Sequence, residues 1–385
     1  MPSAQCLLPG APILILGIES SCDETAAAVV ESGVFVRSSV VASQHALHEE
    51  YAGVVPEIAS RAHVEAIIPV IREALAQAGL GLGMIDAIAV GHRPGLIGSL
   101  LVGVAAAKSL AWSLGKPLIG VDHVEAHLYS GMLREEGEQE GKQAGRQAGR
   151  QGEDDVPLFP ALGLVVSGGH TAMYHLDSWD SISRIGSTID DALGEAYDKA
   201  ATIMGIPYPG GPNLDRLAQQ PGARDTAFDL PISRLSPTSL DFSFSGLKTA
   251  VLYTVRGVPG ERTKPGAPVT RGPLDMTPEH TRDLAASFQK AASRAITLKL
   301  DRAIEHAAQQ GRHYRTLLAG GGVTLNSRLR AELTKLAAAR GLTLRLPAPP
   351  YCMDNAAMIA GLAHEHHQAG RTDTLALQAM PTASR

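Results

Sequence analysis

The chain has 385 residues, of which 44% are hydrophobic and 4% aromatic, and it contains 40 glycines. We expect a large core split between two domains, and the composition favours an α/β fold with tight turns over a β-sandwich. The net charge of −5, from 34 basic and 39 acidic residues, argues against autonomous, charge-driven binding to nucleic acid but is compatible with a local basic surface.

The cysteines and the N-terminal segment indicate the compartment. Cys6, Cys22 and Cys352 make no disulfide framework, which fits a reducing environment. The apolar run at residues 11–18 is too short to span a bilayer and has no basic leader. We therefore expect a soluble cytoplasmic protein with no membrane partner.

Two apolar runs, residues 13–18 and 26–30, predict buried strands near the N-terminus. The turn between them, residues 19–25, reads Glu-Ser-Ser-Cys-Asp-Glu-Thr and carries three carboxylates. Such a turn is either a hairpin with hydrogen-bonding side chains, or a loop that faces a phosphate or a metal. The sequence leaves both interpretations open.

The next predicted elements alternate between helix and strand. Apolar positions recur at Ile67, Ile71 and Leu75 and predict a helix after residues 55–63. The others are a strand at residues 85–90, a helix rich in small residues from Pro94 to Leu114, and a strand at residues 118–121.

A histidine pair, His123 and His127, follows the last of these strands. Two histidines four residues apart on a helix project from one face, so both can bind one metal ion. The alternative is that both side chains cap or line a core helix. Small-residue loops on either side of the pair, and a Cys-Met-Asp-Asn stretch at residues 352–355, favour the metal.

Residues 134–155 differ from the rest of the chain. They are polar and of low complexity, with a Gln-Ala-Gly-Arg unit at residues 143–146 repeated at 147–150. Because such a segment has nothing to bury in a core, we expect a flexible surface insert.

A strand at residues 162–166 is predicted to end in the turn Ser167-Gly168-Gly169-His170-Thr171. Two adjacent glycines let the backbone approach a ligand closely and direct N–H groups at an anion. A plain hairpin explains the same pattern.

A helix is predicted at residues 190–205, with Asp191, Glu195 and Asp198 along one face. Because charges on helices are usually exposed, a solvated acidic face is the alternative to a binding role.

A strand, a glycine turn and a helix follow one another at residues 316–319, 320–322 and 324–340, and the helix carries Asn326. A nucleotide or phosphate site requires this succession. The remaining elements are a rigid loop at 209–212, a helix with Asp215, a helix through Val255, a loop at 257–275, a helix from Thr277 to about His306, and a helix at 356–368 that Asp354 is placed to cap.

Eight blocks of sequence, in order, resemble the TsaD (Gcp/YgjD) family of bacterial tRNA N6-adenosine threonylcarbamoyltransferases. They are residues 17–25, 53–61, 123–127, 166–171, 208–212, 244–248, 320–323 with Asn326, and 354–355. The resemblance extends from about residue 13 to residue 364. One departure is Gly91-His92-Arg93-Pro94-Gly95, where the family usually has Thr-Xaa-Gly-Pro-Gly.

The resemblance implies a fold like that of actin and the sugar kinases (RNase H-like), with two related α/β lobes and a ligand cleft between them. The first lobe is predicted at residues 11–133 plus 346–370 and the second at 156–345, with the flexible insert at 134–155 between them.

The resemblance also implies the activity, which is transfer of a threonylcarbamoyl group from threonylcarbamoyl-adenylate to N6 of adenosine 37 in tRNAs that read codons starting with A. AMP is released. The metal ligands that the resemblance implies are His123, His127 and Asp354, a set that suits iron(II) and allows zinc. Its substrate contacts are Val165, Val166, Ser167, Gly168, Gly169, Asp198, Gly211, Asp215 and Asn326. For the general base we consider Asp23 or Glu24.

The implied partners are the tRNA anticodon loop, TsaB (a related lobe pair) and the ATPase TsaE, with TsaC-type enzymes making the adenylate. Because the chain is acidic, we expect helper subunits to complete a tRNA surface that starts from Arg256, Arg262, Lys264 and Arg271.

Three other functions remain as alternatives. A zinc peptidase usually has His-Glu-Xaa-Xaa-His, and Val124 stands where that glutamate belongs. A sugar kinase or ATPase of the same fold needs no histidine pair on this helix. A non-catalytic paralogue would not need His123, His127 and Asp354 together.

Overall fold

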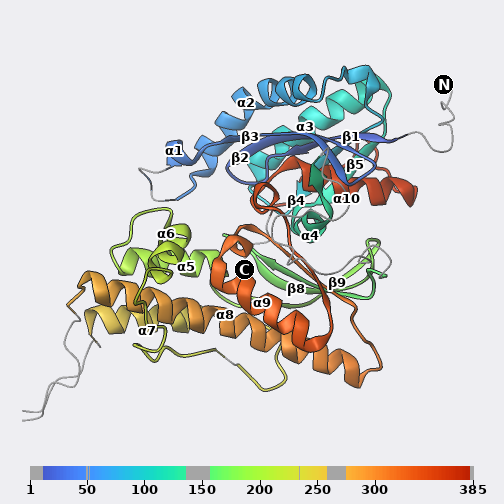
Figure 1. The fold of residues 1–385 in the computed structure, drawn as a ribbon. Coiled ribbons are helices and arrows are strands. Elements are labelled where there is room, and N and C mark those ends of the chain that lie inside the picture. The colour runs from blue at the N-terminus through green and yellow to red at the C-terminus, as the bar shows by residue number, and fades with distance from the viewer. Residues whose placement is uncertain are drawn as a thin grey trace, which may run out of the picture. The chain divides into compact units, whose positions relative to one another are not determined.

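The computed structural model describes residues 12–48, 51, 53–135, 157–233, 235–257 and 275–381. These residues form two compact units (Figure 1). Unit 1 comprises the described parts of Met1–Pro157, Asp177–Ile182 and Arg345–Arg385, and unit 2 those of Leu158–Leu176 and Ser183–Leu344. The predicted insert lies outside the described residues except for Arg134 and Glu135, which form a short strand that pairs with the strand at Phe35–Ser43.

Unit 1 is built on a six-stranded sheet with the strand order β5-β4-β1-β2-β3-β6. Its strands are β1 (Leu14–Glu19), β2 (Glu24–Glu31), β3 (Phe35–Ser43), β4 (Ala87–Arg93), β5 (Leu118–Asp122) and β6 (Arg134–Glu135). β1 runs antiparallel to β2 and parallel to β4, which in turn runs parallel to β5. The strands predicted from apolar runs are therefore confirmed, and the carboxyl ends of β1, β4 and β5 lie at one edge of the sheet.

The helices of unit 1 cover both faces of this sheet (Figure 1). They are α1 (His45–His48), α2 (Pro56–Gln77), α3 (Ile97–Leu114), α4 (His123–Tyr129) and α10 (Ala356–Gln368), with 3₁₀ turns η2 (Leu82–Met84), η3 (Ser130–Met132) and η6 (Pro349–Tyr351). α2 and α3 pack on each other and on the sheet, whereas α10 packs on β1, β2 and β4 together with α4. The contact between α10 and α4 brings the C-terminal part of the chain to the histidine pair.

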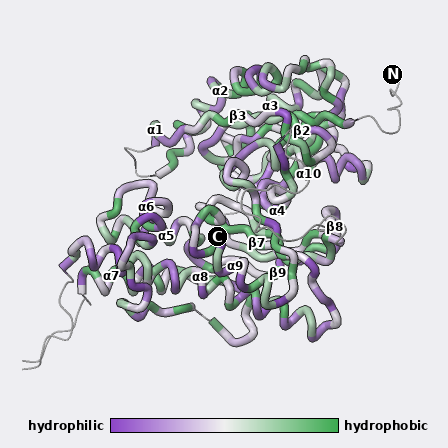
Figure 2. The backbone as a smooth tube through the Cα atoms, viewed as in Figure 1, coloured by the Kyte–Doolittle hydropathy of each residue, from purple (hydrophilic) through white to green (hydrophobic). Residues whose placement is uncertain are grey.

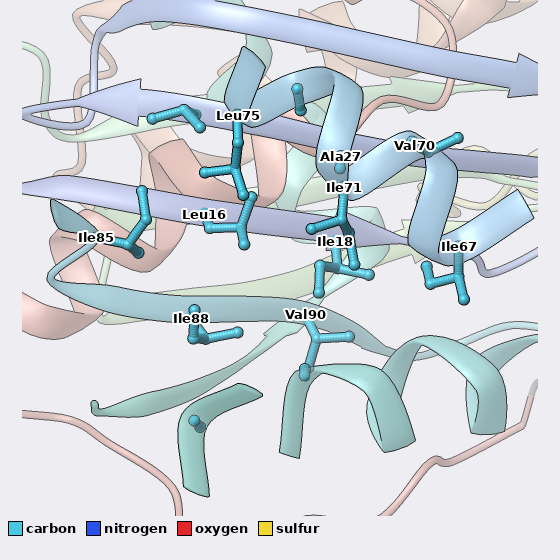
Figure 3. Packing of buried hydrophobic residues seen from close by; sticks show 14 of the residues in the cluster. Leu16, Ile18, Ala27, Ile67, Val70, Ile71, Leu75, Ile85, Ile88 and Val90 are labelled. Carbon is cyan, nitrogen blue, oxygen red and sulfur yellow. The ribbon is translucent and has the colours of Figure 1, made fainter. Parts of the chain in front are cut away.

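The core of unit 1 lies between the sheet and α2 and α3 (Figure 3). Leu16 and Ile18 of β1 alternate with residues that face α10, as expected for a strand covered on both sides. Ile67 and Ile71 of α2 are buried against them, which confirms the periodicity of that helix. Each such side chain contributes about 1.5–3 kcal/mol when it is fully buried, so the core holds β1 and its carboxyl end firmly in place.

Among the described residues, α3 is long and apolar enough to cross a membrane by length and composition. A third of it is buried in unit 1, through Leu100, Val104 and Ala107 in particular. Core helices of soluble proteins have the same properties, so α3 is weak evidence for a membrane span.

Unit 2 contains a five-stranded sheet with the strand order β11-β10-β7-β8-β9. The strands are β7 (Ala161–Val166), β8 (Thr171–Ser178), β9 (Ser181–Ser187), β10 (Thr316–Gly320) and β11 (Thr343–Arg345). β7 is mostly coloured hydrophobic in Figure 2 and is fully buried. This order repeats β5-β4-β1-β2-β3 of unit 1, with the first strand again antiparallel to the second and parallel to its other neighbour. The repeat confirms an α/β fold of two related halves.

The helices of unit 2 are α5 (Leu193–Ile203), α6 (Gly210–Ala218), α7 (Ser245–Arg256), α8 (Pro278–Gln309) and α9 (Ser327–Arg340), with the 3₁₀ turn η5 (Gly322–Leu325). Two predictions need correction. The rigid loop expected at 209–212 is mostly helix, because α6 begins at Gly210. The helix expected from Thr324 begins only at Ser327, because η5 comes first and the Asn326 side chain caps α9 by accepting from Leu329 N (3.0 Å). Asn326 is thus at the helix end and not within the helix.

Candidate metal centre and substrate-binding residues

The histidine pair lies on α4, which begins directly after β5. Asp122 caps this helix, since its Oδ1 accepts hydrogen bonds from Val124 N (2.9 Å) and Glu125 N (3.2 Å). Its Oδ2 lies 3.2 Å from Nε of Arg93, the last residue of β4, in the stretch that departs from the family pattern. With the helix start fixed in this way, His123 and His127 project from one face, with ring centroids 4.8 Å apart.

Asp354 joins the pair from the loop between η6 and α10. The helix cap that the sequence allowed for Asp354 is instead Asn355, whose Oδ1 accepts from Met358 N (2.9 Å). The Asp354 carboxylate points to the histidines, with Oδ1 3.2 Å from His127 Nε2 and 3.5 Å from His123 Nε2. Three side chains that lie far apart in the sequence thus meet at one point of unit 1.

The environment of these side chains fits a cation. One donor atom from each of them lies within 4.8 Å of the others. His127 is fully buried, and neither of its ring nitrogens has a hydrogen-bond partner among the described residues, so its 3.2 Å approach to Asp354 is close but is not a hydrogen bond. A buried nitrogen without a partner is costly. Two imidazole nitrogens and one carboxylate oxygen could therefore hold a metal ion.

Charge around His123 is strongly negative. Burial alone would lower the pKa of His123, but the Glu19 and Asp354 carboxylates outweigh that effect and raise the pKa to about 10. The same surroundings favour a bound cation.

Both candidates for the general base, Asp23 and Glu24, lie at the end of the turn between β1 and β2. His45 Nε2 lies 3.1 Å from Glu24 Oε1 and 3.9 Å from Asp23 Oδ2. Burial, together with the charges of Asp354 and Asp23, raises the pKa of Glu24 to about 9. Glu24 thus keeps its proton at pH 7, whereas Asp23 is partly exposed.

Two further side chains, one packed against this turn and one within it, were not singled out as site residues from the sequence. The buried His63 of α2 bonds Thr25 Oγ1 (2.7 Å) and the Cys22 carbonyl (2.9 Å) and so holds the turn against the helix. Burial raises the pKa of the Cys22 thiol far above neutrality, which makes it a poor nucleophile. An apolar-face histidine carries little signal in a sequence, because buried histidines are common.

The predicted glycine turn lies at the carboxyl end of β7 in unit 2. Ser167 N donates to the His170 carbonyl (2.8 Å), which closes the turn, and Gly168 and Gly169 are exposed. Gly194 N, in the first turn of α5, donates to the Ser167 carbonyl (3.2 Å). The turn therefore lies over the N-terminus of a helix, where backbone N–H groups favour an anion.

The glycine turn after β10 lies against the same place, because β10 pairs in parallel with β7. Gly321 has φ +94° and ψ 156°, and an added Cβ would collide with the Val166 carbonyl oxygen. Only glycine fits this position, so the two turns are packed together at one edge of the sheet.

The predicted substrate residues of α5 and α6 also bond to the protein itself. Asp198 Oδ1 accepts from Gly211 N (3.1 Å) and so fixes the start of α6. Asp215 accepts from Ser327 Oγ (2.7 Å) and Gln289 Nε2 (2.7 Å), which ties α6 to α9 and α8. The alternative of a purely solvated acidic face is wrong for Asp198, whose carboxylate is bonded and largely buried, and burial raises its pKa.

The metal group lies wholly in unit 1, and the predicted substrate residues Val165–Gly169, Asp198, Gly211, Asp215 and Asn326 lie wholly in unit 2. Of the four basic residues predicted to contact tRNA, Arg256 is exposed at the end of α7. Arg262, Lys264 and Arg271 lie outside the described residues.

A family model described as TsaD, tRNA N6-adenosine threonylcarbamoyltransferase, matches residues 35–142 and 143–361. A protein of that name from Trichlorobacter lovleyi is 46% identical over 370 residues, which is 96% of each chain. Another from Moorella thermoacetica is 45% identical over 368 residues, which is 95% of this chain and 96% of that one. Among solved structures, T. kodakarensis HypF has a TM-score of 0.52 at 16% identity and matches 93% of this chain and 49% of its own length, a likeness that concerns the fold alone.

Proposed function

The chain belongs to the tRNA N6-adenosine threonylcarbamoyltransferase family, and from that premise we propose how this enzyme works. It transfers the threonylcarbamoyl group of threonylcarbamoyl-adenylate to N6 of adenosine 37 in tRNAs that read codons starting with A, and it releases AMP. The observation that carries the proposal is the meeting of His123, His127 and Asp354 at one buried point. A peptidase is disfavoured, because Val124 replaces the glutamate that zinc peptidases use as a base.

His123, His127 and Asp354 hold one divalent cation in this proposal, with iron(II) preferred and zinc possible for this donor set. When bound, the cation supplies Lewis-acid and template chemistry to the threonylcarbamoyl group. His127 supports this role, because its buried nitrogens have no other partner among the described residues.

The residues of unit 2 bind the adenylate. The exposed N–H groups of Gly168 and Gly169, above the N-terminus of α5, are suited to its phosphate. Val165 and Val166 end β7 and are fully buried, so in this proposal they position the turn, and Ser167 begins it. Asp198, Gly211, Asp215 and Asn326 contact the ribose and base through the polar atoms that their internal bonds leave available.

The transfer step needs a base, because an exocyclic adenine amine is a poor nucleophile. N6 attacks the carbamoyl carbon, the bond from that carbon to the phosphate oxygen breaks, and the amine proton passes to the base while AMP leaves. Asp23, which is partly exposed, suits this role better than the buried Glu24. Adenosine 37 lies in the unpaired anticodon loop, where a base can be extruded into a pocket.

A reconstituted assay tests this function. The purified chain, its TsaB and TsaE partners and tRNA should convert added threonylcarbamoyl-adenylate into the modified nucleoside, detected by mass spectrometry of digested tRNA. A parallel reaction with threonine, bicarbonate, ATP and a TsaC-type enzyme should give the same product. Threonine, bicarbonate and ATP are cytoplasmic metabolites, and we assign the protein to the cytoplasm. Unmodified adenosine in both reactions, with all components shown to be folded, would contradict the proposal.

We propose that TsaB binds an exposed apolar face on α2 and α3. Val64 and Ile68 of α2 and Leu101 and Trp112 of α3 line an open groove and are 50–75% exposed. A related lobe pair carries counterparts of these two helices, so the two apolar faces can bury one another.

Replacing Trp112 with glutamate should weaken TsaB binding by about 30-fold, the effect of losing an aromatic hot spot of about 2 kcal/mol. Isothermal titration calorimetry measures this affinity. Leu375→Glu is the matched control, because Leu375 is also an exposed apolar residue of unit 1 but lies in the C-terminal segment. If Trp112→Glu binds TsaB with unchanged affinity, the apolar face is not part of the interface with TsaB. If the same variant changes the oligomeric state of the chain on its own, the face binds a second copy of the chain.

A further inference from the structure

Glu19 is a buried carboxylate next to the candidate metal centre, at the end of β1. It has no exposed surface, and both of its oxygens are engaged. Oε1 accepts a hydrogen bond from Ser21 N (2.5 Å), and Oε2 lies 3.0 Å from His123 Nδ1. Burial of a carboxylate costs free energy unless the group is paired. The contact between Glu19 and His123 provides this pairing, and we ask what it does for the metal centre.

This contact fixes which nitrogen of His123 faces the other ligands. A carboxylate can only accept, so Nδ1 carries the proton that is shared with Glu19, and Ser21 Oγ, 3.2 Å from the same nitrogen, can accept it as well. Nε2 is the nitrogen that faces Asp354 Oδ1, at 3.5 Å. The carboxylate, the imidazole and the point where the three candidate ligands meet therefore lie in sequence, as in the carboxylate–histidine–metal arrangement of many metalloproteins.

His127 has no such support, because its Nδ1 lacks a hydrogen-bond partner among the described residues. The two histidines are therefore not equivalent. The His123 ring has a charged partner at Nδ1 and the His127 ring has none there, so the loss of Glu19 should affect the orientation of His123 specifically.

Gly91 of the neighbouring strand β4 makes room for Glu19. β1 and β4 pair in parallel up to Ile18 and Val90, which places Gly91 beside Glu19. A Cβ at Gly91 would collide with Glu19 Oε2. The position of the carboxylate thus depends on a second residue, on a different strand, that has no contact with the ligands itself.

We propose that Glu19 is a positioning residue of the metal centre, which accepts the Nδ1 proton of His123 and so directs Nε2 at the cation. The inference rests on the proposed metal role of His123, His127 and Asp354. Glu19 touches neither the cation nor the substrate, and it acts through His123.

The test is metal binding by the purified full-length chain, stripped of metal and titrated with Co²⁺ and Zn²⁺. Glu19→Gln keeps the shape of the side chain but removes its charge. We expect metal affinity to fall by about 10–100-fold, as for other outer partners of ligating histidines, and the Co²⁺ absorption spectrum to change. Gly91→Ala should show the same two changes, because it displaces the carboxylate. Glu31→Gln is the control, since Glu31 pairs with Arg37 at the far end of β2.

Three outcomes separate the claims. If His127→Ala binds Co²⁺ as tightly as the natural chain, the proposed metal role of the histidine pair is wrong and the role of Glu19 falls with it. If His127→Ala loses Co²⁺ but Glu19→Gln and Gly91→Ala keep the natural affinity and spectrum, the positioning role alone is overturned. Loss of affinity and a changed spectrum in both variants, with Glu31→Gln unaffected, support it.

Discussion

Replacing His127 with alanine should abolish threonylcarbamoyl transfer while the chain stays folded. The change removes one of three candidate donors, and the remaining imidazole and carboxylate make too few bonds to hold a divalent ion tightly. We expect bound metal to fall at least tenfold and the transfer rate to fall by about 100-fold or more. Loss of a residue that only hydrogen-bonds to a metal ligand already costs about 10–100-fold in metal affinity or activity.

The fold should tolerate this change for a physical reason. The cavity left by the imidazole destabilises the chain, but the two buried nitrogens without partners disappear with it. We expect a net loss of about 1–2 kcal/mol, compared with the stability of about 5–15 kcal/mol of typical proteins.

Elemental analysis, mass spectrometry of the nucleoside and thermal melting measure these three effects. His175→Ala is the matched control, because His175 is also a buried histidine but belongs to unit 2. It should keep its metal and its activity. Full activity of metal-free His127→Ala would refute the metal role.

The strands that the sequence predicts well are those buried along most of their length. β1, β4 and β7 are continuous apolar runs, and such runs identify buried strands. β3 and β9 are not predicted, because their residues are mostly half-buried or exposed and form no such run. β8 is not predicted either, although its first six residues are buried, because Thr171 and His175 leave no continuous apolar run. Their strand conformation depends on pairing with a neighbour, which a local pattern does not contain.

The candidate metal centre was predictable only in part from local pattern. The spacing of His123 and His127 is visible on any helix, and Asp122 marks where that helix starts. The place of Asp354 depends on the packing of α10 against β1 and α4, a contact between distant segments. The role of Asp354 as a ligand is therefore predicted only by the family resemblance. The local pattern instead predicts that Asp354 caps the helix, and in the structure Asn355 provides that cap.

Glu19 shows what the sequence contained but did not reveal. A carboxylate that directly continues an apolar run is a signal of a buried charge, but the turn of residues 19–25 offered several acidic side chains. Only the neighbouring strand, with Gly91, shows which of them is fully enclosed. Likewise, the internal bonds of Asp198 and Asp215 are made to Gly211 and Ser327, segments whose proximity is a result of folding.

Replacing Gly321 with alanine should strongly impair binding of the adenylate. Gly321 has φ +94° and ψ 156°, a region that is essentially restricted to glycine, and its added Cβ would collide with the Val166 carbonyl oxygen. Relief of this clash must move the end of β7, and with it the turn that carries Gly168 and Gly169. We expect a loss of stability of about 1–3 kcal/mol and, because the phosphate would lose aligned N–H donors worth about 1.4 kcal/mol or more, at least a tenfold rise in KM for threonylcarbamoyl-adenylate.

Gly341→Ala separates backbone strain from displacement of the turn. Gly341 ends α9 in the same unit with φ +66°, and nothing lies within 4 Å of an added Cβ there. Alanine at this position should cost about 1 kcal/mol of stability through its left-handed conformation but leave KM unchanged. If Gly321→Ala and Gly341→Ala have similar stability but different KM values, the difference is due to displacement of the glycine turn and not to a general loosening of unit 2. If Gly321→Ala has the KM of the natural chain, the glycine turn of residues 167–169 does not hold the phosphate, and the adenylate must bind elsewhere.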